Sequence, residues 1–264
     1  MTHSRTIRIG PTEALVAHLV EHLCRVVEAA VALRGVCTLA IPGGSVATAV
    51  LPVLAQRQLP WRAVHLFWCD ERAVPLADSD SNGGAAMRLI ARSPLAEQAT
   101  WHLMRGDAAD LRRAAVDYAA ELAVVAGRPP VLDVVLLGVG EDGHVASLFP
   151  RHDTDTDTDT DSDSDTEREQ TVQLVTNAPK TPPTRLTLSF PVLTAARETI
   201  VMAFGSSKSS AVRAALEESD MRSPLARIVR ESLTLLLLLD GQAARQLTHT
   251  VTHTVTPTGV EHIA

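Results

Sequence analysis

The first half of the chain alternates two kinds of apolar pattern. From Thr12 to Leu33, apolar residues recur at intervals of three and four, which is the spacing of one helix face. Other segments repeat this helical pattern, and the short runs between them are mostly apolar, as buried strands are. The predicted helices are Thr12–Leu33, Ala47–Gln56, Asn82–Ala91 and Ala108–Val125, and the predicted strands are Val36–Ile41, Val64–Cys69 and Leu132–Leu137. This alternation predicts an α/β fold with a parallel sheet and helices on both faces.

The second half continues the pattern without a break that demands a separate domain. It contains predicted strands at Arg185–Phe190, Thr199–Ala203 and Leu233–Leu239, and a predicted helix at Lys208–Glu217. We therefore expect a single α/β domain over residues 1–247. Residues 153–165 alternate Asp with Thr or Ser, which predicts a disordered loop at about 152–169, because no apolar side chain offsets the entropy of ordering. Residues 248–264 are expected to form a frayed polar tail.

Composition and charge narrow the classes of function. Of the 264 residues, 45% are hydrophobic and 21% charged, so the chain can bury a large core without disulfides or a structural metal. The formal net charge of −7 owes much to the Asp-rich run. The sequence lacks the basic stripe of a nucleic-acid-binding protein. A nearly neutral body can still bind a small anion through a few placed cations.

The cysteines and the apolar runs indicate a compartment. Cys24, Cys37 and Cys69 lack the spacing of a zinc site or a disulfide framework, and we expect them to be reduced and buried. The first ten residues lack the apolar segment of a signal peptide. The longest aliphatic run, Leu235–Leu239, is too short to cross a bilayer. We therefore expect a cytoplasmic protein with no membrane partner.

Polar clusters follow three of the predicted strands. Pro42–Ser45 follows the first strand, Asp70–Arg72 the second and Gly138–His144 the third. In a parallel sheet with helices on both faces, ligands gather beyond the carboxyl ends of the strands. We therefore expect all three clusters to lie at the ligand-binding edge of the sheet.

The first two clusters each allow two interpretations. Gly43 and Gly44 let backbone amides approach an anion at a helix N-terminus, where Ser45 can cap the helix or donate to a phosphate, yet a plain strand-to-helix turn has the same residues. Arg72 carries a planar fork that suits an oxyanion. The alternative for Asp70–Arg72 is a surface turn with a local ion pair.

The third cluster is the sharpest local signal. Its three glycines between Gly138 and Gly143 indicate a tight turn beyond a buried strand. His144, held at the end of such a turn, can act near neutral pH as a general base and then as a general acid. Asp142 could orient the imidazole or stabilise its charged form. The alternative, a histidine that caps a loop, is less consistent with the glycines and the strand end.

Three cations of the second half are candidates for binding an anion. Lys180 lies in a proline-rich loop, Arg185 begins a predicted strand, and Lys208 follows a glycine turn that leads from a strand to a helix. Lys and Arg side chains that converge on a helix N-terminus would make a phosphate site. The alternative is that all three are solvated surface cations.

These residues resemble the signatures of the 6-phosphogluconolactonase family. The similarity runs in order from about Gly10 to Asp240, and five ordered motifs make a chance match improbable. The matching segments are Ile41–Ser45, Phe67–Pro75, Asp80–Asn82, Leu137–Pro150 and Pro179–Leu193. The chain departs from the family pattern at Val46–Ala47, where Thr-Pro is usual, at Gly83, where an aromatic residue is usual, and at Ser209, where Ala is usual. The Asp-rich insertion is also unusual.

The resemblance implies a modified doubly wound (Rossmann-like), mostly parallel fold in a superfamily with glucosamine-6-phosphate deaminases and ribose-5-phosphate isomerases. It implies hydrolysis of 6-phosphoglucono-δ-lactone in the pentose phosphate pathway, with no required metal or organic cofactor. By motif match His144 is the general base, Arg72 contacts the substrate, and Gly44, Ser45, Arg185 and Lys208 contact phosphate. Residue patterns and resemblance together give catalytic His144, Arg72 and Asp142, and substrate- or phosphate-binding Gly43, Gly44, Ser45, Asp70, Lys180, Arg185 and Lys208.

The hypothesis is that neutral His144 activates a water molecule for attack on the lactone carbonyl while Arg72 stabilises the oxyanion. A glucosamine-6-phosphate deaminase or isomerase is the nearest alternative, in which Asp70 would abstract a carbon-bound proton. A non-catalytic sugar-phosphate-binding protein is the alternative from another class. The expected partner is a small sugar-phosphate lactone, not a nucleic acid or a membrane. We expect a monomer or a weak homodimer.

Overall fold

The computed structural model describes residues 3–150, 171–218, 221–248 and 260–262. Its main sheet has eight strands in the order β11-β1-β10-β9-β6-β2-β3-β5, and every neighbouring pair runs parallel. The strands are β1 (Ser4–Gly10), β2 (Cys37–Ile41), β3 (Val64–Trp68), β5 (Thr100–Trp101), β6 (Val134–Gly138), β9 (Glu198–Ala203), β10 (Thr234–Asp240) and β11 (Val260–His262). This arrangement confirms the predicted α/β class and its parallel sheet.

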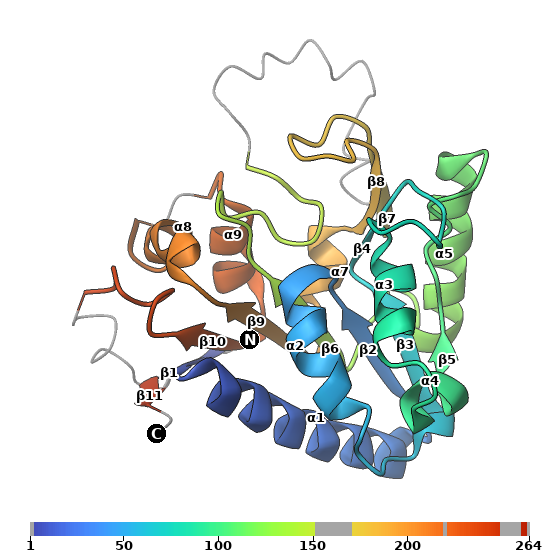
Figure 1. The fold of residues 1–264 in the computed structure, drawn as a ribbon, viewed down its shortest axis with the longest axis horizontal. Coiled ribbons are helices and arrows are strands. Elements are labelled where there is room, and N and C mark those ends of the chain that lie inside the picture. The colour runs from blue at the N-terminus through green and yellow to red at the C-terminus, as the bar shows by residue number, and fades with distance from the viewer. Residues whose placement is uncertain (1–2, 151–170, 219–220, 249–259, 263–264) are drawn as a thin grey trace.

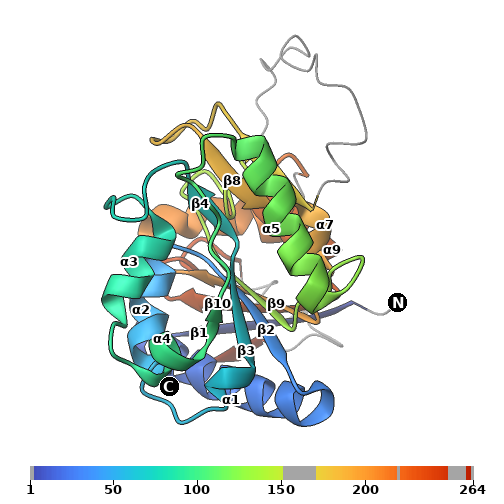
Figure 2. The same cartoon turned by 90° about the vertical axis from the view of Figure 1, so that its right-hand side faces the viewer.

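Helices cover both faces of this sheet. Figure 2 shows α2 and α3 on one side of the strands and α5, α7 and α9 on the other. The helices are α1 (Thr12–Arg34), α2 (Gly44–Leu54), α3 (Asn82–Leu89), α4 (Pro94–Gln98), α5 (Leu111–Ala126), α7 (Phe190–Thr194), α8 (Ser209–Arg213) and α9 (Pro224–Glu231), with short turns η1 (Trp61–Ala63), η3 (Ser206–Lys208) and η4 (Ala214–Glu218). None of the helices in the described ranges is long and apolar enough to cross a membrane.

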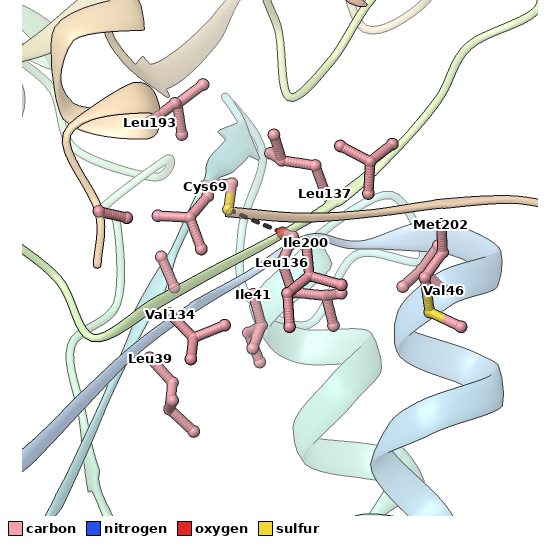
Figure 3. Close-up of a cluster of buried hydrophobic side chains, with 14 of the residues drawn as sticks. Leu39, Ile41, Val46, Cys69, Val134, Leu136, Leu137, Leu193, Ile200 and Met202 are labelled. Atoms are coloured by element: carbon pink, nitrogen blue, oxygen red, sulfur yellow. Dashed lines mark hydrogen bonds between the residues drawn. The ribbon is translucent and has the colours of Figure 1, made fainter. Parts of the chain in front are cut away.

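Aliphatic side chains form the core between the sheet and the helices. Figure 3 shows Leu39, Leu136 and Ile200 from three neighbouring strands packed together, all at most 3% exposed. The Cys69 thiol donates to the Leu136 carbonyl at 3.2 Å and is buried, whereas Cys24 is only half-buried. Because aromatics are scarce, interlocking branched side chains supply the close packing of this core. The core therefore fixes the strands whose carboxyl ends carry the polar clusters.

A second, smaller sheet was not predicted from the sequence. It is antiparallel and consists of β4 (Asp70–Arg72), β8 (Arg185–Leu188) and β7 (Val172–Val175) in the order β4-β8-β7. The predicted strand Arg185–Phe190 thus ends at Leu188 and belongs to this sheet. Its pairing places Arg72 directly opposite Arg185, so the charged cluster after β3 forms a strand.

The carboxyl-terminal region differs from the expected frayed tail. Residues 260–262 form β11, which pairs in parallel with Ile7–Ile9 of β1. Without that pairing, β1 would be an edge strand with unpaired backbone groups, and this need explains why a polar segment is recruited. The expected disordered loop at 152–169 lies outside the described residues.

Candidate active site

One cleft of about 300 Å³ lies at the carboxyl edge of the main sheet. The loops that follow β6 and precede β8 rise above this edge in Figure 1. Nine of the ten predicted site residues line the cleft, and Asp142 contacts two of them. The nine are Gly43, Gly44, Ser45, Asp70, Arg72, His144, Lys180, Arg185 and Lys208. The structure therefore brings together residues that are up to 165 positions apart (208 − 43).

The turn between β2 and α2 exposes the first amides of the helix. No side chain caps α2, and Gly44 and Ser45 are exposed, so the backbone N–H groups of the first turn are open to the cleft. Gly44 has a φ of +66°, which favours glycine. A Cβ atom on Gly43 would lie 1.8 Å from Oδ1 of Asn82, so this position requires glycine for close approach. This geometry suits an anion and also satisfies a strand-to-helix turn.

His144 is held by its neighbour Asp142. The imidazole Nδ1 lies 2.5 Å from Asp142 Oδ1, and the side chain of His144 is 16% exposed. An ionised carboxylate only accepts hydrogen bonds, so Nδ1 carries the proton and Nε2 keeps its lone pair. A Cβ atom on Gly140 would lie 1.9 Å from Nδ1, and Gly143 has a φ of +82°. The glycines of this cluster therefore make room for the imidazole and permit the turn.

The electrostatics keep His144 neutral and Asp142 ionised near neutral pH. Burial lowers the pKa of His144, and Lys180 adds to this effect, which the hydrogen bond with Asp142 only partly offsets. Burial raises the pKa of Asp142, but the interactions with His144 and Lys180 outweigh it, so the pKa is below its usual value. A neutral ring beside an ionised carboxylate is the state that a general base requires.

Arg185 fastens the loop that carries Lys180. Its side chain is buried, Nε donates to the Pro182 carbonyl at 2.9 Å, and Nη2 donates to the Lys180 carbonyl at 3.0 Å. Lys180 Nζ is thereby placed 3.8 Å from Asp142 Oδ1. The other terminal nitrogen of the guanidinium, Nη1, donates to the Ser147 hydroxyl at 3.5 Å. Arg185 thus shares its donors between the loop and the cleft.

Arg72 and Arg185 are cross-strand neighbours on β4 and β8. Burial lowers the pKa of Arg185, and the charge of Arg72 lowers it further. Arg72 Nη1 donates to the Asp80 carbonyl at 2.7 Å, which orients the guanidinium without neutralising it. Like charges directly opposite each other in a sheet repel, so this pair favours an anion between or beside the two side chains.

Asp70 is fixed by two residues to which the sequence assigned no role. Its Oδ2 accepts from the Ser147 hydroxyl at 2.6 Å, and its Oδ1 accepts from Asn82 Nδ2 at 3.2 Å. Asp70 and Ser147 are at most 5% exposed. Asn82 and Ser147 lie inside the segments that carry the family resemblance, but only the fold shows that both contact one carboxylate.

Glu71 contradicts the surface-turn interpretation of the charged cluster. It is 3% exposed and accepts hydrogen bonds from four donors in the segment that follows β4 or in β4 itself. The donors are the backbone N–H groups of Arg72, Asn82 and Gly83, and the hydroxyl of Ser81. A Cβ atom on Gly83 would lie 3.2 Å from Glu71 Oε2. A larger residue at this position would press against the Glu71 carboxylate.

Lys208 reaches the cleft from the turn after β9. Gly205, with a φ of +86°, starts this turn, and the Lys208 backbone N–H donates to its carbonyl at 3.1 Å. Among the described residues, no group of three or more His, Cys, Asp or Glu side chains is placed to hold a metal ion. The described residues in and beside the cleft thus offer one imidazole, the ordered carboxylates of Asp70 and Asp142, and several cations.

The fold and cleft define a doubly wound α/β protein in which one histidine and four cationic side chains line a cleft at the carboxyl edge of the sheet. The family described as glucosamine-6-phosphate isomerases/6-phosphogluconolactonase matches residues 11–237, and the chain belongs to this family.

Named relatives cover nearly the whole chain. The 6-phosphogluconolactonase of Mycobacterium tuberculosis is 37% identical over 92% of this chain and 99% of its own length. That of Synechocystis is 34% identical over 83% of this chain and 88% of its own. The crystal structure of 6-phosphogluconolactonase from Leishmania guyanensis superposes with a TM-score of 0.74 at 27% identity, covering 92% of this chain and 99% of the other.

Proposed function

We propose that this protein hydrolyses 6-phospho-D-glucono-1,5-lactone to 6-phospho-D-gluconate, a step of the pentose phosphate pathway. The observation that carries the proposal is the His144–Asp142 pair, which lies in the same cleft as four cationic side chains. The names of the relatives at 34% and 37% identity support the same substrate. The cleft volume of about 300 Å³ suits one sugar phosphate.

The proposed reaction uses His144 twice. Nε2 takes a proton from water as the water oxygen bonds to the lactone carbonyl carbon. The imidazolium of His144 then protonates the ring oxygen of the lactone as the bond between that oxygen and the carbonyl carbon breaks. The product is an open-chain acid, and the imidazole of His144 is neutral again. Asp142 keeps the proton on Nδ1 and stabilises the charged ring between the two transfers. Arg72 stabilises the developing oxyanion, as its position beside the cleft allows.

The phosphate is proposed to bind where the Gly43–Ser45 turn, Lys208 and Arg185 line the cleft. The open amides of the Gly43–Ser45 turn supply donors, and the side chains of Lys208 and Arg185 supply charge. Lys180 is proposed to contact the substrate as well, from the loop above Asp142. Binding the distant phosphate would orient the lactone carbonyl near His144.

The wild-type protein tests the reaction directly. We expect it to consume 6-phosphoglucono-1,5-lactone in an assay coupled to 6-phosphogluconate oxidation. We also expect no release of ammonia from glucosamine 6-phosphate, because hydrogen bonds from Ser147 and Asn82 engage both oxygens of Asp70. Ammonia release would favour the deaminase alternative. Binding of 6-phosphogluconate without turnover of the lactone would favour a non-catalytic sugar-phosphate-binding protein.

Replacing Lys180 by methionine is expected to move the acid limb of the pH profile to higher pH. The limb reports protonation of His144, since kcat/KM falls as the pH drops through the pKa of the general base. Burial and Lys180 both lower that pKa, so removing the lysine charge raises it. The measurement is kcat/KM for the lactone as a function of pH. Lys180→Arg keeps the charge and should keep the limb in place, whereas an unchanged limb in Lys180→Met would contradict the expectation.

A further inference from the structure

Asp240 joins three separate segments at the carboxyl edge of the sheet. It is the last residue of β10, and its Oδ2 accepts from the Gly205 backbone N–H at 2.9 Å. Its Oδ1 accepts from the Ala243 backbone N–H at 2.7 Å, and the Thr12 hydroxyl lies 3.5 Å from Oδ2. A half-buried carboxylate that accepts from the backbone of two different turns fixes those turns relative to each other.

The strands that carry this contact are themselves firmly placed. Leu239 of β10 pairs with Ala203 of β9, and Gly10 of β1 pairs with Asp240 on the other side. Figure 1 shows β9 and β10 side by side and α8 beyond the end of β9. Asp240 is therefore held on a paired strand, while Gly205 lies two residues beyond the end of the neighbouring strand.

The contact leads to a cationic side chain of the cleft. Gly205 starts the turn with a φ of +86°, and its carbonyl accepts from the Lys208 backbone N–H at 3.1 Å. The Ser209 hydroxyl closes the same turn by donating to the Ser206 carbonyl at 2.7 Å. Lys208 lines the cleft, whereas Asp240 does not. Asp240 therefore acts on the cleft through the turn that carries Lys208.

We propose that Asp240 positions Lys208 for the phosphate group of the substrate. The carboxylate fixes the Gly205–Lys208 turn, and through it sets how strongly the cleft prefers a phosphorylated lactone to an unphosphorylated one. This inference rests on the proposed function. Asp240 is a positioning residue, since it touches the turn and not the cleft.

Asp240→Asn tests the role of the carboxylate. Asparagine keeps one acceptor oxygen but puts an NH₂ group in place of the other, so it cannot accept from Gly205 and Ala243 together. We expect KM for 6-phosphoglucono-1,5-lactone to rise about tenfold with kcat little changed. A rise of this size corresponds to weakening one charge-assisted hydrogen bond, here the one from Lys208 to the phosphate. For unphosphorylated glucono-1,5-lactone we expect the same kcat/KM as the wild type. Asp117→Asn, on the exposed face of α5, is the matched control and should change neither.

A second variant reaches the turn without touching the carboxylate. Gly205→Ala has free space around the added methyl group, but its φ of +86° is strained for alanine. It should therefore show the same selective rise in KM. The double variant of Asp240→Asn with Lys208→Ala should lose no more than Lys208→Ala alone, because both changes remove one contact.

The outcomes separate the two proposals. Wild-type preference for the phosphorylated lactone bears on the proposed function, and wild-type failure to hydrolyse it would overturn both. If the wild type shows that preference, an equal loss on both lactones in folded Asp240→Asn and Gly205→Ala would overturn only the positioning role. An unchanged KM for the phosphorylated lactone in these two variants would also overturn the positioning role. Calorimetric binding of 6-phosphogluconate, weaker in both variants, would support it without relying on turnover.

Discussion

His144→Asn is expected to lower kcat for lactone hydrolysis about 100- to 10,000-fold, which is the range for one positioned acid/base group. Asparagine is close to the imidazole in size and can keep a hydrogen bond to Asp142, but it cannot take a proton from water. KM should change little, because the phosphate contacts lie on other residues. The measurement is steady-state turnover of the lactone, corrected for its spontaneous hydrolysis.

A second histidine provides the control for that change. His22 lies on α1 and pairs with Glu198 at 2.7 Å, and it is not among the residues that line the cleft. His22→Asn should keep wild-type turnover. Near-wild-type turnover in His144→Asn would rule out the general-base role, and the imidazole would then have to act only in binding.

Glu71→Leu is expected to have the largest effect on stability, a loss of about 3 kcal/mol in the free energy of unfolding. Leucine fills similar space but accepts nothing, so the backbone N–H groups of Asn82 and Gly83 and the Ser81 hydroxyl lose their buried partner. For a chain of this size the fall in Tm should be roughly 10 °C. Thermal unfolding followed by circular dichroism measures it.

The same substitution at an exposed site separates burial from charge. Glu28 is exposed on α1, and Glu28→Leu should change the free energy of unfolding by less than about 0.5 kcal/mol. Because the Glu71 network also holds the segment whose Asp80 carbonyl orients Arg72, the folded fraction of Glu71→Leu should also turn over more slowly. A Tm within 2 °C of the wild type's, a shift of under about 1 kcal/mol, would show that water replaces the lost acceptor.

The main sheet could be predicted because its strands are buried on both faces. Predominantly apolar runs such as Val64–Cys69 and Leu132–Leu137 have few other stable locations, and amphipathic helices between them leave a parallel sheet as the simple solution. Their boundaries were less certain. The predicted helix at Ala47 begins at Gly44, since glycines and an open turn carry no apolar periodicity.

The second sheet could not be predicted because its strands are short and its pairing is non-local. Asp70–Arg72 has three charged residues and no alternation, and its partner lies more than 100 residues later in the chain. Strand β11 was equally hard to predict, since this polar segment becomes a strand by pairing with the edge of β1.

For the candidate site, reactive residue types were predictable and their supporting contacts were not. His144, Asp142 and the cations stand out by chemistry and by the glycines around them. Asn82 and Ser147 are ordinary polar residues until the fold places both against Asp70. Glu71 has no local signal at all, because three of its four donors become partners only when the segment after β4 folds back.

The facing arginines of β4 and β8 set the stability of the small sheet against the proposed function of the cleft. Arg72 and Arg185 oppose each other across two strands, a pairing that works against the small sheet on its own. A dianion bound at the proposed site would offset that repulsion, so we expect substrate and product to stabilise the small sheet. A substitution that removes one of the two arginines would therefore stabilise the small sheet but weaken binding at the proposed site.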